Sequence, residues 1–218
     1  MSSYYNKTSR VTVRRRAGRA KYDRATIDRI LDQGLVAHLG LASGEQPYVL
    51  PVLYARSDAE LYLHGSPLSR LLGGLAKAVP VCVTVTMVDG LVLARSAFHH
   101  SLNYRSVVVL GEGRAVRDRD EKRRALRTIV EHAVPGRSDD VRGPSEQELD
   151  ATEVVAVAIR EASAKIRTGP PLDSAEDRAI PAWAGQVPLS LSPGEPVPDD
   201  QCTTALPSYL RSYERAHA

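Results

Sequence analysis

The chain has 218 residues, of which 25% are charged and 43% hydrophobic, with a formal net charge of +3 and a pI of about 8.9. This length favours one domain with a full hydrophobic core, and the mild basic excess falls short of that typical of nucleic-acid-binding proteins. No apolar run approaches the ~18 residues that a membrane span needs, and residues 1–10 lack the apolar centre of a secretory signal. We therefore expect a cytoplasmic protein without membrane or nucleic-acid partners.

The two cysteines, Cys82 and Cys202, are far apart in the sequence and indicate neither a disulfide framework nor a zinc site. Basic residues are dense before residue 25, and we interpret residues 1–20 as a flexible basic arm. A nucleic-acid-binding arm is the alternative, but no aromatic or helix-turn-helix pattern accompanies these charges. We place the folded domain at 21–183 and a proline-rich C-terminal arm at 184–218.

The first predicted helix begins after Asp23, a good N-cap, and ends at Gly34. Its apolar residues recur at helical spacing at Ile27, Ile30 and Leu31. Two β-rich runs, 35–42 and 47–55, then flank a short Ser43-Gly44 turn and predict a hairpin. Pro51 has no backbone N–H, so its strand is expected to be broken or at a sheet edge there.

A short strand over 61–65 is followed by Ser66-Pro67, which predicts a serine-capped helix start. Free N–H groups and the positive end of the helix dipole favour an anion there, and Ser66, Ser69 and Arg70 add a guanidinium and hydroxyl groups. An ordinary capped helix with an exposed arginine is the alternative.

The stretch 91–113 predicts two apolar strands separated by a polar turn over 99–104. Before it, Asp89-Gly90 between the β-branched runs 79–88 and 91–98 has the signature of a type I′ hairpin. The turn places Asn103, Tyr104 and Arg105 together as hydrogen-bond donors between rigid strands. These donors and those near Ser66 could converge on one anion.

Further elements follow in the second half of the chain. Asp118 caps a predicted helix that runs to Val134, Ser145 and Glu148 fit a capping box, and 154–161 predicts a last central strand. From Lys165 onward the chain is rich in proline and indicates a wrapping arm. Because strands outnumber helices and do not alternate with them, the sequence predicts a mainly β fold: an antiparallel β-barrel with peripheral helices.

Three further features bear on chemistry. His64 ends a strand beside the predicted phosphate site and is either a catalytic base, a substrate contact or a structural histidine. The histidines lack a companion ligand cluster, so no metal site is predicted. In the C-terminal arm, Trp183 near Lys165 and Arg167 suits a flat anionic cofactor, although plain packing explains the tryptophan equally well.

These residues carry a family resemblance. The segments LYLHGSPLSR, VCVTVTMVDGLVLARSAFHHSLNYRSVVVLGEG and EASAKIRTGPPLD resemble the flavin-nucleotide-binding members of the pyridoxamine 5′-phosphate oxidase-like superfamily, which includes the nitroimidazole-resistance (Nim) proteins. The resemblance covers roughly residues 14–183. It implies an FMN-binding split β-barrel that works as a homodimer, with FMN lodged between the subunits.

The resemblance also implies which residues bind the cofactor. In Nim-like proteins a histidine at the position of His64 lies close to the flavin. The implied FMN contacts are Val49, Leu50, Pro51, Val52, His64, Gly65, Ser66, Ser69, Arg70, Asn103, Tyr104, Arg105, Ser106, Lys165, Arg167 and Trp183. The oxidase proper has a lysine after its Ser-Arg pair, where this chain has Leu71, and its C-terminal substrate motif is not evident. Pyridoxamine phosphate is therefore not the expected substrate.

The leading hypothesis is an FMN-dependent oxidoreductase that passes electrons to a small organic acceptor, such as a nitroaromatic compound. A flavin carrier or redox-sensing flavin protein without turnover would use the same phosphate site. A third interpretation keeps the barrel but replaces the ligand by haem or a deazaflavin coenzyme, as other relatives in the superfamily do.

Overall fold

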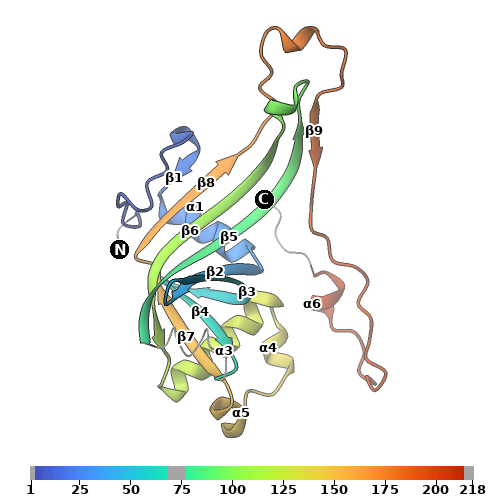
Figure 1. The fold of residues 1–218 in the computed structure, drawn as a ribbon. Helices are drawn as coiled ribbons and strands as arrows, with labels where there is room; N and C mark the ends of the chain where they lie inside the picture. Colours follow the sequence, from blue (N-terminus) through green and yellow to red (C-terminus); the bar gives the residue numbers. More distant parts are fainter. Residues whose placement is uncertain (1–2, 68–76, 214–218) are drawn as a thin grey trace.

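The structure, a computed structural model, describes residues 3–67 and 77–213. Within these ranges the fold is one antiparallel sheet of nine strands (Figure 1). The strands are β1 (Ala20–Lys21), β2 (Val36–Ser43), β3 (Gln46–Ser57), β4 (Glu60–Gly65), β5 (Lys77–Leu93), β6 (Ser101–Ala115), β7 (Glu153–Ala158), β8 (Glu161–Arg167) and β9 (Gly185–Pro188).

Helices lie around this sheet. The described α-helices are α1 (Arg24–Gln33), α3 (Arg119–Ala133), α4 (Arg137–Asp140), α5 (Glu146–Asp150) and α6 (Ser208–Arg211). Short 3₁₀ helices are η1 (Ala17–Arg19), η2 (Ala97–His99) and η3 (Asp177–Ala179). None of the helices in the described ranges is long and apolar enough to cross a bilayer.

The sheet closes on itself because β6 pairs with both β5 and β7. The ring runs β6–β7–β4–β3–β2–β5 and back to β6, while β8 with β1 branches from β6 and β9 branches from β5. This is the antiparallel barrel with peripheral helices that the sequence predicts. Figure 1 shows β5 and β6 continuing beyond the barrel as a long two-stranded extension.

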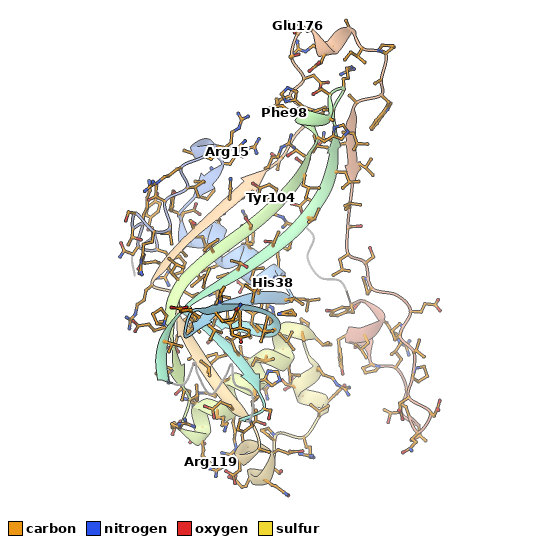
Figure 2. The ribbon with its side chains drawn as sticks, viewed as in Figure 1. Arg15, His38, Phe98, Tyr104, Arg119 and Glu176 are labelled. Atoms are coloured by element: carbon orange, nitrogen blue, oxygen red, sulfur yellow. The ribbon has the colours of Figure 1, made fainter. Side chains whose placement is uncertain are left out.

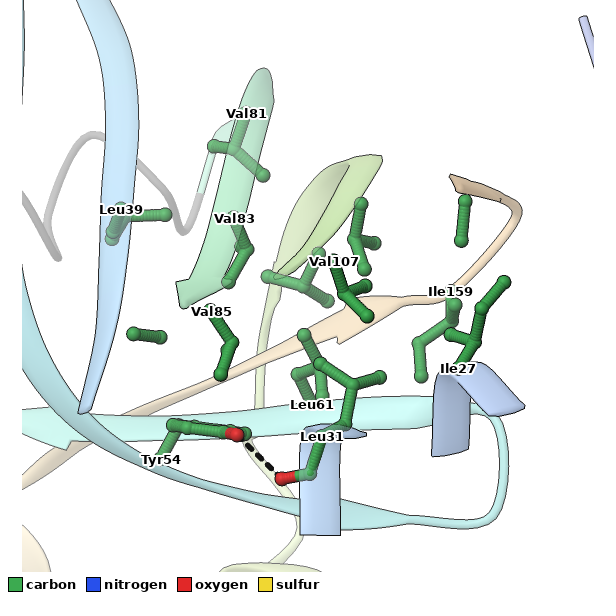
Figure 3. Close-up of a cluster of buried hydrophobic side chains, with 14 of the residues drawn as sticks. Ile27, Leu31, Leu39, Tyr54, Leu61, Val81, Val83, Val85, Val107 and Ile159 are labelled. Carbon is green, nitrogen blue, oxygen red and sulfur yellow. Dashed lines mark hydrogen bonds between the residues drawn. The ribbon is translucent and has the colours of Figure 1, made fainter. Parts of the chain in front are cut away.

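The core lies inside the ring and is lined by alternate residues of the strands. Leu39, Leu61, Val83 and Val107 are buried there, and the apolar face of α1 packs against them (Figure 3). Tyr54 contributes the largest of the fully buried side chains, and its hydroxyl donates to the Leu31 carbonyl at 2.5 Å. A smaller cluster lies on the outer side of β4 and β7, under α3.

Local capping explains the helix boundaries. Asp23 accepts a hydrogen bond from the Thr26 N–H at 2.8 Å, Asp118 does the same for Glu121 at 2.7 Å, and Ser145 and Glu148 form a complete capping box. These three predicted starts are confirmed, as is the β2–β3 hairpin. Residues 46–53 of β3 have no described partner strand on the side away from β2, so the prediction of an edge at Pro51 is also confirmed.

Two predictions about the β5–β6 region are wrong. Asp89-Gly90 is not a hairpin turn: β5 continues through it to Leu93, with a bulge at Asp89. The turn after β5 lies at residues 94–100, and β6 begins at Ser101, so Asn103 and Tyr104 lie within a strand. β9 pairs with β5 beside this bulge, and its close approach requires glycine: a Cβ on Gly90 would lie 2.8 Å from the Val187 carbonyl oxygen.

Two further boundaries differ from the prediction. The predicted strand 154–161 is two strands, β7 and β8, and Lys165 and Arg167 belong to β8 rather than to an arm. The segment between the predicted helix end at Val134 and the capping box at Ser145 contains the short helix α4, which the sequence analysis does not predict. Residues 3–23 contact the body through the β1–β8 pairing, and Arg10 forms an ion pair with Glu161. The predicted helix after Ser66-Pro67, with Ser69 and Arg70, lies outside the described residues.

Candidate functional site

The residues predicted to bind a cofactor lie on two separate parts of one chain. The first group, on β6 and β8, contains Asn103, Tyr104, Ser106, Lys165 and Arg167, and Trp183 follows in the connection to β9. The second group, Val49–Val52 and 64–66, lies on β3 and at the end of β4. None of the three cavities described below is lined by residues of both groups.

Register places four residues of the first group on one face. Residues directly opposite in an antiparallel pair point to the same side of the sheet. Tyr104 lies opposite Arg167. Ser106 lies opposite Lys165, and its hydroxyl donates to the Lys165 carbonyl at 3.3 Å. Figure 2 shows Tyr104 on the β6 part of the extension.

Arg167 is a buried cation without a carboxylate partner among the described residues. It is 4% exposed, and its guanidinium donates only to neutral acceptors: the Asn103 side-chain oxygen and the carbonyls of Gly169 and Pro170. Its Nε has no hydrogen-bond partner. Burial, followed by the nearby charge of Arg19, lowers the pKa of Arg167.

Asn103 connects three strands around this guanidinium. Its oxygen accepts from Arg167, and its amide nitrogen donates to Gln186 Oε1 on β9 at 2.6 Å. Trp183 is 67% exposed and lies over Gly185, where a Cβ would be 2.9 Å from the indole ring. The sequence predicted Asn103, Arg167 and Trp183 as cofactor contacts. It did not predict the hydrogen bonds that join β6, β8 and β9 here, because it treated β7 and the start of β8 as one strand.

Arg105 occupies a different environment from Arg167. It lines a cavity of about 500 Å³ between β2, β5 and residues 189–193, together with His38 and Asp89. Its guanidinium pairs with the Asp89 carboxylate and donates to Gln33 Oε1 at 2.6 Å. A role of Arg105 in binding a phosphate stays a prediction.

The second group lies on an exposed strand edge. Val49 is 64% exposed and Leu50 41% exposed, and Val49 lines a cavity of about 480 Å³ that also contains Cys82. Since the backbone of 46–53 pairs on one side only, its other polar groups are free to contact a ligand or a second chain. Ser66 is exposed and lies just after β4.

His64 lines a third cavity, of about 660 Å³, on the outer side of the barrel. Burial lowers its pKa, which favours the neutral imidazole at pH 7. The other walls come from α3, α4 and the segment leading to α5, including four arginines: Arg123, Arg127, Arg137 and Arg142. Sequence reasoning missed this cluster because the arginines come from separate segments of the chain; the i, i+4 spacing of Arg123 and Arg127 was the available signal.

No three His, Cys, Asp or Glu side chains gather as metal ligands within residues 3–67 and 77–213. The fold is a split β-barrel. It carries the buried guanidinium of Arg167, which has no carboxylate partner among the described residues, and a separate cavity lined by His64. The family model described as pyridoxamine 5′-phosphate oxidase matches residues 23–166, and the chain belongs to this family.

Solved structures extend the comparison. The flavocytochrome Anf3 from Azotobacter vinelandii is 36% identical, with a TM-score of 0.89 over 96% of this chain and 98% of that one. The FAD and heme binding protein from Mycobacterium smegmatis is also 36% identical, with a TM-score of 0.85 over 88% and 96%. A comparison with curated proteins found no match.

A putative 5-nitroimidazole antibiotic resistance protein from Bacteroides thetaiotaomicron is 24% identical, with a TM-score of 0.58 over 67% of this chain and 86% of that one. This likeness supports the fold alone. The resemblance to the pyridoxamine 5′-phosphate oxidase-like superfamily is confirmed by the family model, and so is the mainly antiparallel split-barrel fold.

Proposed function

We propose that this chain is a flavin-binding redox protein that also binds haem. The observation that carries the proposal is the likeness, over nearly the full length of both chains, to a flavocytochrome and to a protein that binds FAD and haem. Flavin supplies reversible one- and two-electron chemistry when bound, and the protein supplies binding, orientation and exclusion of water.

The environment of Arg167 fits an anionic flavin tail. A buried charge is costly unless it is paired, and this guanidinium has only neutral acceptors and one unpartnered N–H among the described residues. A phosphate oxygen would supply the missing counter-ion. Lys165 lies on the same face of β8, two residues away, and adds a second cation.

We further propose FAD rather than FMN. The initial resemblance implies FMN, whereas the Mycobacterium smegmatis relative is named as an FAD-binding protein. Arg19 lies near enough to Arg167 for its charge to lower the pKa of Arg167. Two guanidiniums and Lys165 in one region suit a diphosphate better than a single phosphate.

The flavin site is proposed to form between two copies of the chain. The exposed edge of β3 and the β6–β8 face carry complementary halves of the predicted contacts, yet they share none of the three cavities. Exposed apolar residues on and beside the β3 edge, such as Tyr48, Val49 and Leu50, favour burial against another chain. Mass measurement in solution tests this directly: a monomer with bound flavin contradicts a shared site.

The proposed reaction is electron transfer from a reduced nicotinamide to a small acceptor such as a quinone or a nitroaromatic compound. In the quinone case, a hydride and one further proton yield the hydroquinone. A flavin carrier without turnover is the competing function, because it would use the same anion site.

The test begins with the visible spectrum and cofactor content of the purified protein. Bound FAD, identified by mass after release, and acceptor-dependent consumption of NAD(P)H support the proposal. A colourless protein that takes up no flavin on titration overturns it. If the protein binds flavin but does not turn over with any nicotinamide and acceptor pair, the function is that of a flavin carrier.

A further inference from the structure

The basic residues at the start of the chain form a surface that the proposed function does not use. Residues 1–22 contain seven lysines or arginines and no aspartate or glutamate, whereas the rest of the chain has more acidic than basic residues. The formal net charge of +3 therefore combines a strongly basic start with an acidic remainder. Four exposed cations lie within residues 14–21, and we name them the N-terminal basic surface: Arg14, Arg15, Arg16 and Lys21.

The structure holds this segment against the body of the protein. Val11 is 4% exposed, the Val13 N–H donates to the Tyr22 hydroxyl at 3.0 Å, and β1 pairs with β8. The backbone between these contacts forms the 3₁₀ helix η1. The four cations are thus presented on an ordered backbone, so a partner that binds them has less chain entropy to remove.

These cations have no partners within the described part of the chain. None of the four side chains forms an ion pair or a hydrogen bond there. The arginines of α3 differ, because residues 119, 123 and 127 each pair with a carboxylate. Arg16 also has a left-handed backbone, with a φ of 59°, which is costly for a residue other than glycine. Unpaired charge and local strain at one place indicate a surface that serves binding rather than stability.

The shape of the N-terminal basic surface favours a large partner over a small ligand. None of its four side chains lines one of the three cavities described above. Figure 2 shows Arg15 at the outer edge of the molecule. A small anion would have no walls here to exclude water, whereas the face of another macromolecule could cover all four cations at once.

An acidic protein fits this surface better than a membrane or a nucleic acid. A membrane anchor needs large apolar side chains among its cations, but residues 14–21 consist of arginine, alanine, glycine and lysine alone. A nucleic acid is a long polyanion that would also approach the net-acidic remainder of the chain. A compact patch of carboxylates on a protein can meet the basic surface without that repulsion.

The N-terminal basic surface borders the face proposed to bind the flavin tail. Ala20 of β1 lies opposite Lys165 of β8. Arg19 lies near enough to Arg167 for the two charges to interact. A redox protein docked here would bring its electron-carrying group toward that face. Complexes between redox proteins are transient, bury less than about 1,200 Å² and depend on opposite charges, which a small exposed basic surface can supply.

We propose that the N-terminal basic surface is the docking site for an acidic electron-transfer protein that reduces the bound flavin. The proposal rests on the flavin part of the proposed function and adds a protein donor to the reduced nicotinamide. In each docking event the reduced centre of the partner loses one electron to the flavin. Two such events, with protons from water, reduce the flavin fully. Because docking is electrostatic, it weakens as salt screens the charges.

The first experiment uses two acidic probes, a reduced plant-type [2Fe–2S] ferredoxin and a reduced flavodoxin. Each is mixed anaerobically with the flavin-loaded protein, and stopped-flow absorbance gives the second-order rate constant for flavin reduction. This rate constant should fall at least about tenfold from low to high salt. A rate constant that is independent of salt for both probes overturns the proposal.

The second experiment removes charge from the basic surface. The triple variant Arg14→Gln/Arg15→Gln/Lys21→Gln leaves the backbone of Arg16 unchanged. Its rate constant at low salt should be at least about tenfold lower than that of the parent chain. Flavin content and NAD(P)H consumption should stay at the parent values, because these residues are not among the proposed flavin contacts.

A matched triple variant controls for the net charge. Arg29→Gln/Arg124→Gln/Arg178→Gln removes three exposed arginines that lie outside the basic surface. Its rate constant should differ from that of the parent chain by less than about threefold. Equal losses in the two triple variants would show that net charge alone governs the rate and would overturn the docking site.

Further outcomes separate this proposal from the proposed function. A parent chain that binds no flavin overturns the proposed function and the donor role with it. A flavin-loaded chain that the probes reduce equally fast with and without the basic surface overturns the docking site alone. Retention of the parent chain, but not of the first triple variant, on duplex DNA at physiological salt would assign the surface to nucleic acid if neither probe binds. Circular dichroism confirms that each variant is folded.

Discussion

The guanidinium of Arg105 and the carboxylate of Asp89 form an ion pair across the β5–β6 ladder, with Nη2 2.7 Å from Oδ1. Both side chains are partly buried, and Nε of Arg105 also lies 3.1 Å from Oδ2. The β5 bulge brings Asp89 to this position. Arg105 is thus neutralised within its own chain, whereas Arg167, on the neighbouring strand β8, has no carboxylate partner among the described residues.

Arg105→Gln is therefore expected to reduce stability more than flavin binding. A partly buried bidentate pair contributes about 1–2 kcal/mol, which corresponds to about 2–8 °C in Tm for a chain of this size. Thermal unfolding and flavin titration of the same variant provide the measurement. A tenfold loss of flavin affinity with an unchanged Tm would instead support Arg105 as a phosphate contact.

Arg167→Gln, in contrast, is expected to reduce flavin binding more than stability. Loss of a charge-assisted hydrogen bond to the flavin phosphate costs about 1.5–3 kcal/mol, or about 10- to 150-fold in the dissociation constant. Fluorescence quenching of added flavin measures the affinity. Arg124→Gln, an exposed arginine on α3, controls for the lost charge and should bind flavin normally. Equal affinity of the Arg167 variant and the parent would remove Arg167 from the site.

The lowered pKa of Glu148 predicts that its contribution to the stability of the fold is lost at acid pH. The Arg142 side chain and the capping box lower the pKa of Glu148 to about 2 from its usual value of 4.5. Since the folded-state pKa is the lower one, the stabilisation is complete above about pH 4.5 and is lost as the pH falls through about 2. The Tm difference between the parent chain and Glu148→Gln should therefore be largest at neutral pH and shrink below pH 4.5.

Thermal unfolding scans across that pH range test the prediction. Glu195→Gln, in the C-terminal segment, controls for the loss of one carboxylate. A Tm difference for Glu148→Gln that stays constant down to about pH 2 would show that the ion pair and the capping box do not hold this carboxylate in its charged form.

Gly90→Ala should loosen β9 from β5. The added Cβ would lie 2.8 Å from the Val187 carbonyl oxygen, closer than real Cβ contacts, so the β5–β9 ladder must shift. We expect faster amide hydrogen exchange in 185–188 and easier proteolysis of the C-terminal segment, with the barrel core still protected. Gly143→Ala, where a Cβ meets no atom within 4 Å, is the control. Unchanged exchange in 185–188 would contradict the close approach.

The sequence alone determined the features that depend on near neighbours. Asp23, Asp118 and Ser145 cap helices through N–H groups three residues away, so their positions could be predicted. The β2–β3 hairpin likewise depends on a short turn between two β-rich runs. The split barrel and the expectation of a flavin cofactor followed from the segments that resemble the family.

The tertiary structure decided what depends on distant partners. Asp89-Gly90 has the local pattern of a turn, yet in the fold it is a bulge in one long strand, and β9, almost a hundred residues later, pairs with that strand from Gly90 onward. Arg105 and Arg167, both in strands, differ because only Arg105 meets a carboxylate among the residues that the structure describes. His64 and the α3 arginines gather at one cavity because alternation on β4 and the helical repeat of α3 turn them toward each other, a juxtaposition that no local pattern encodes.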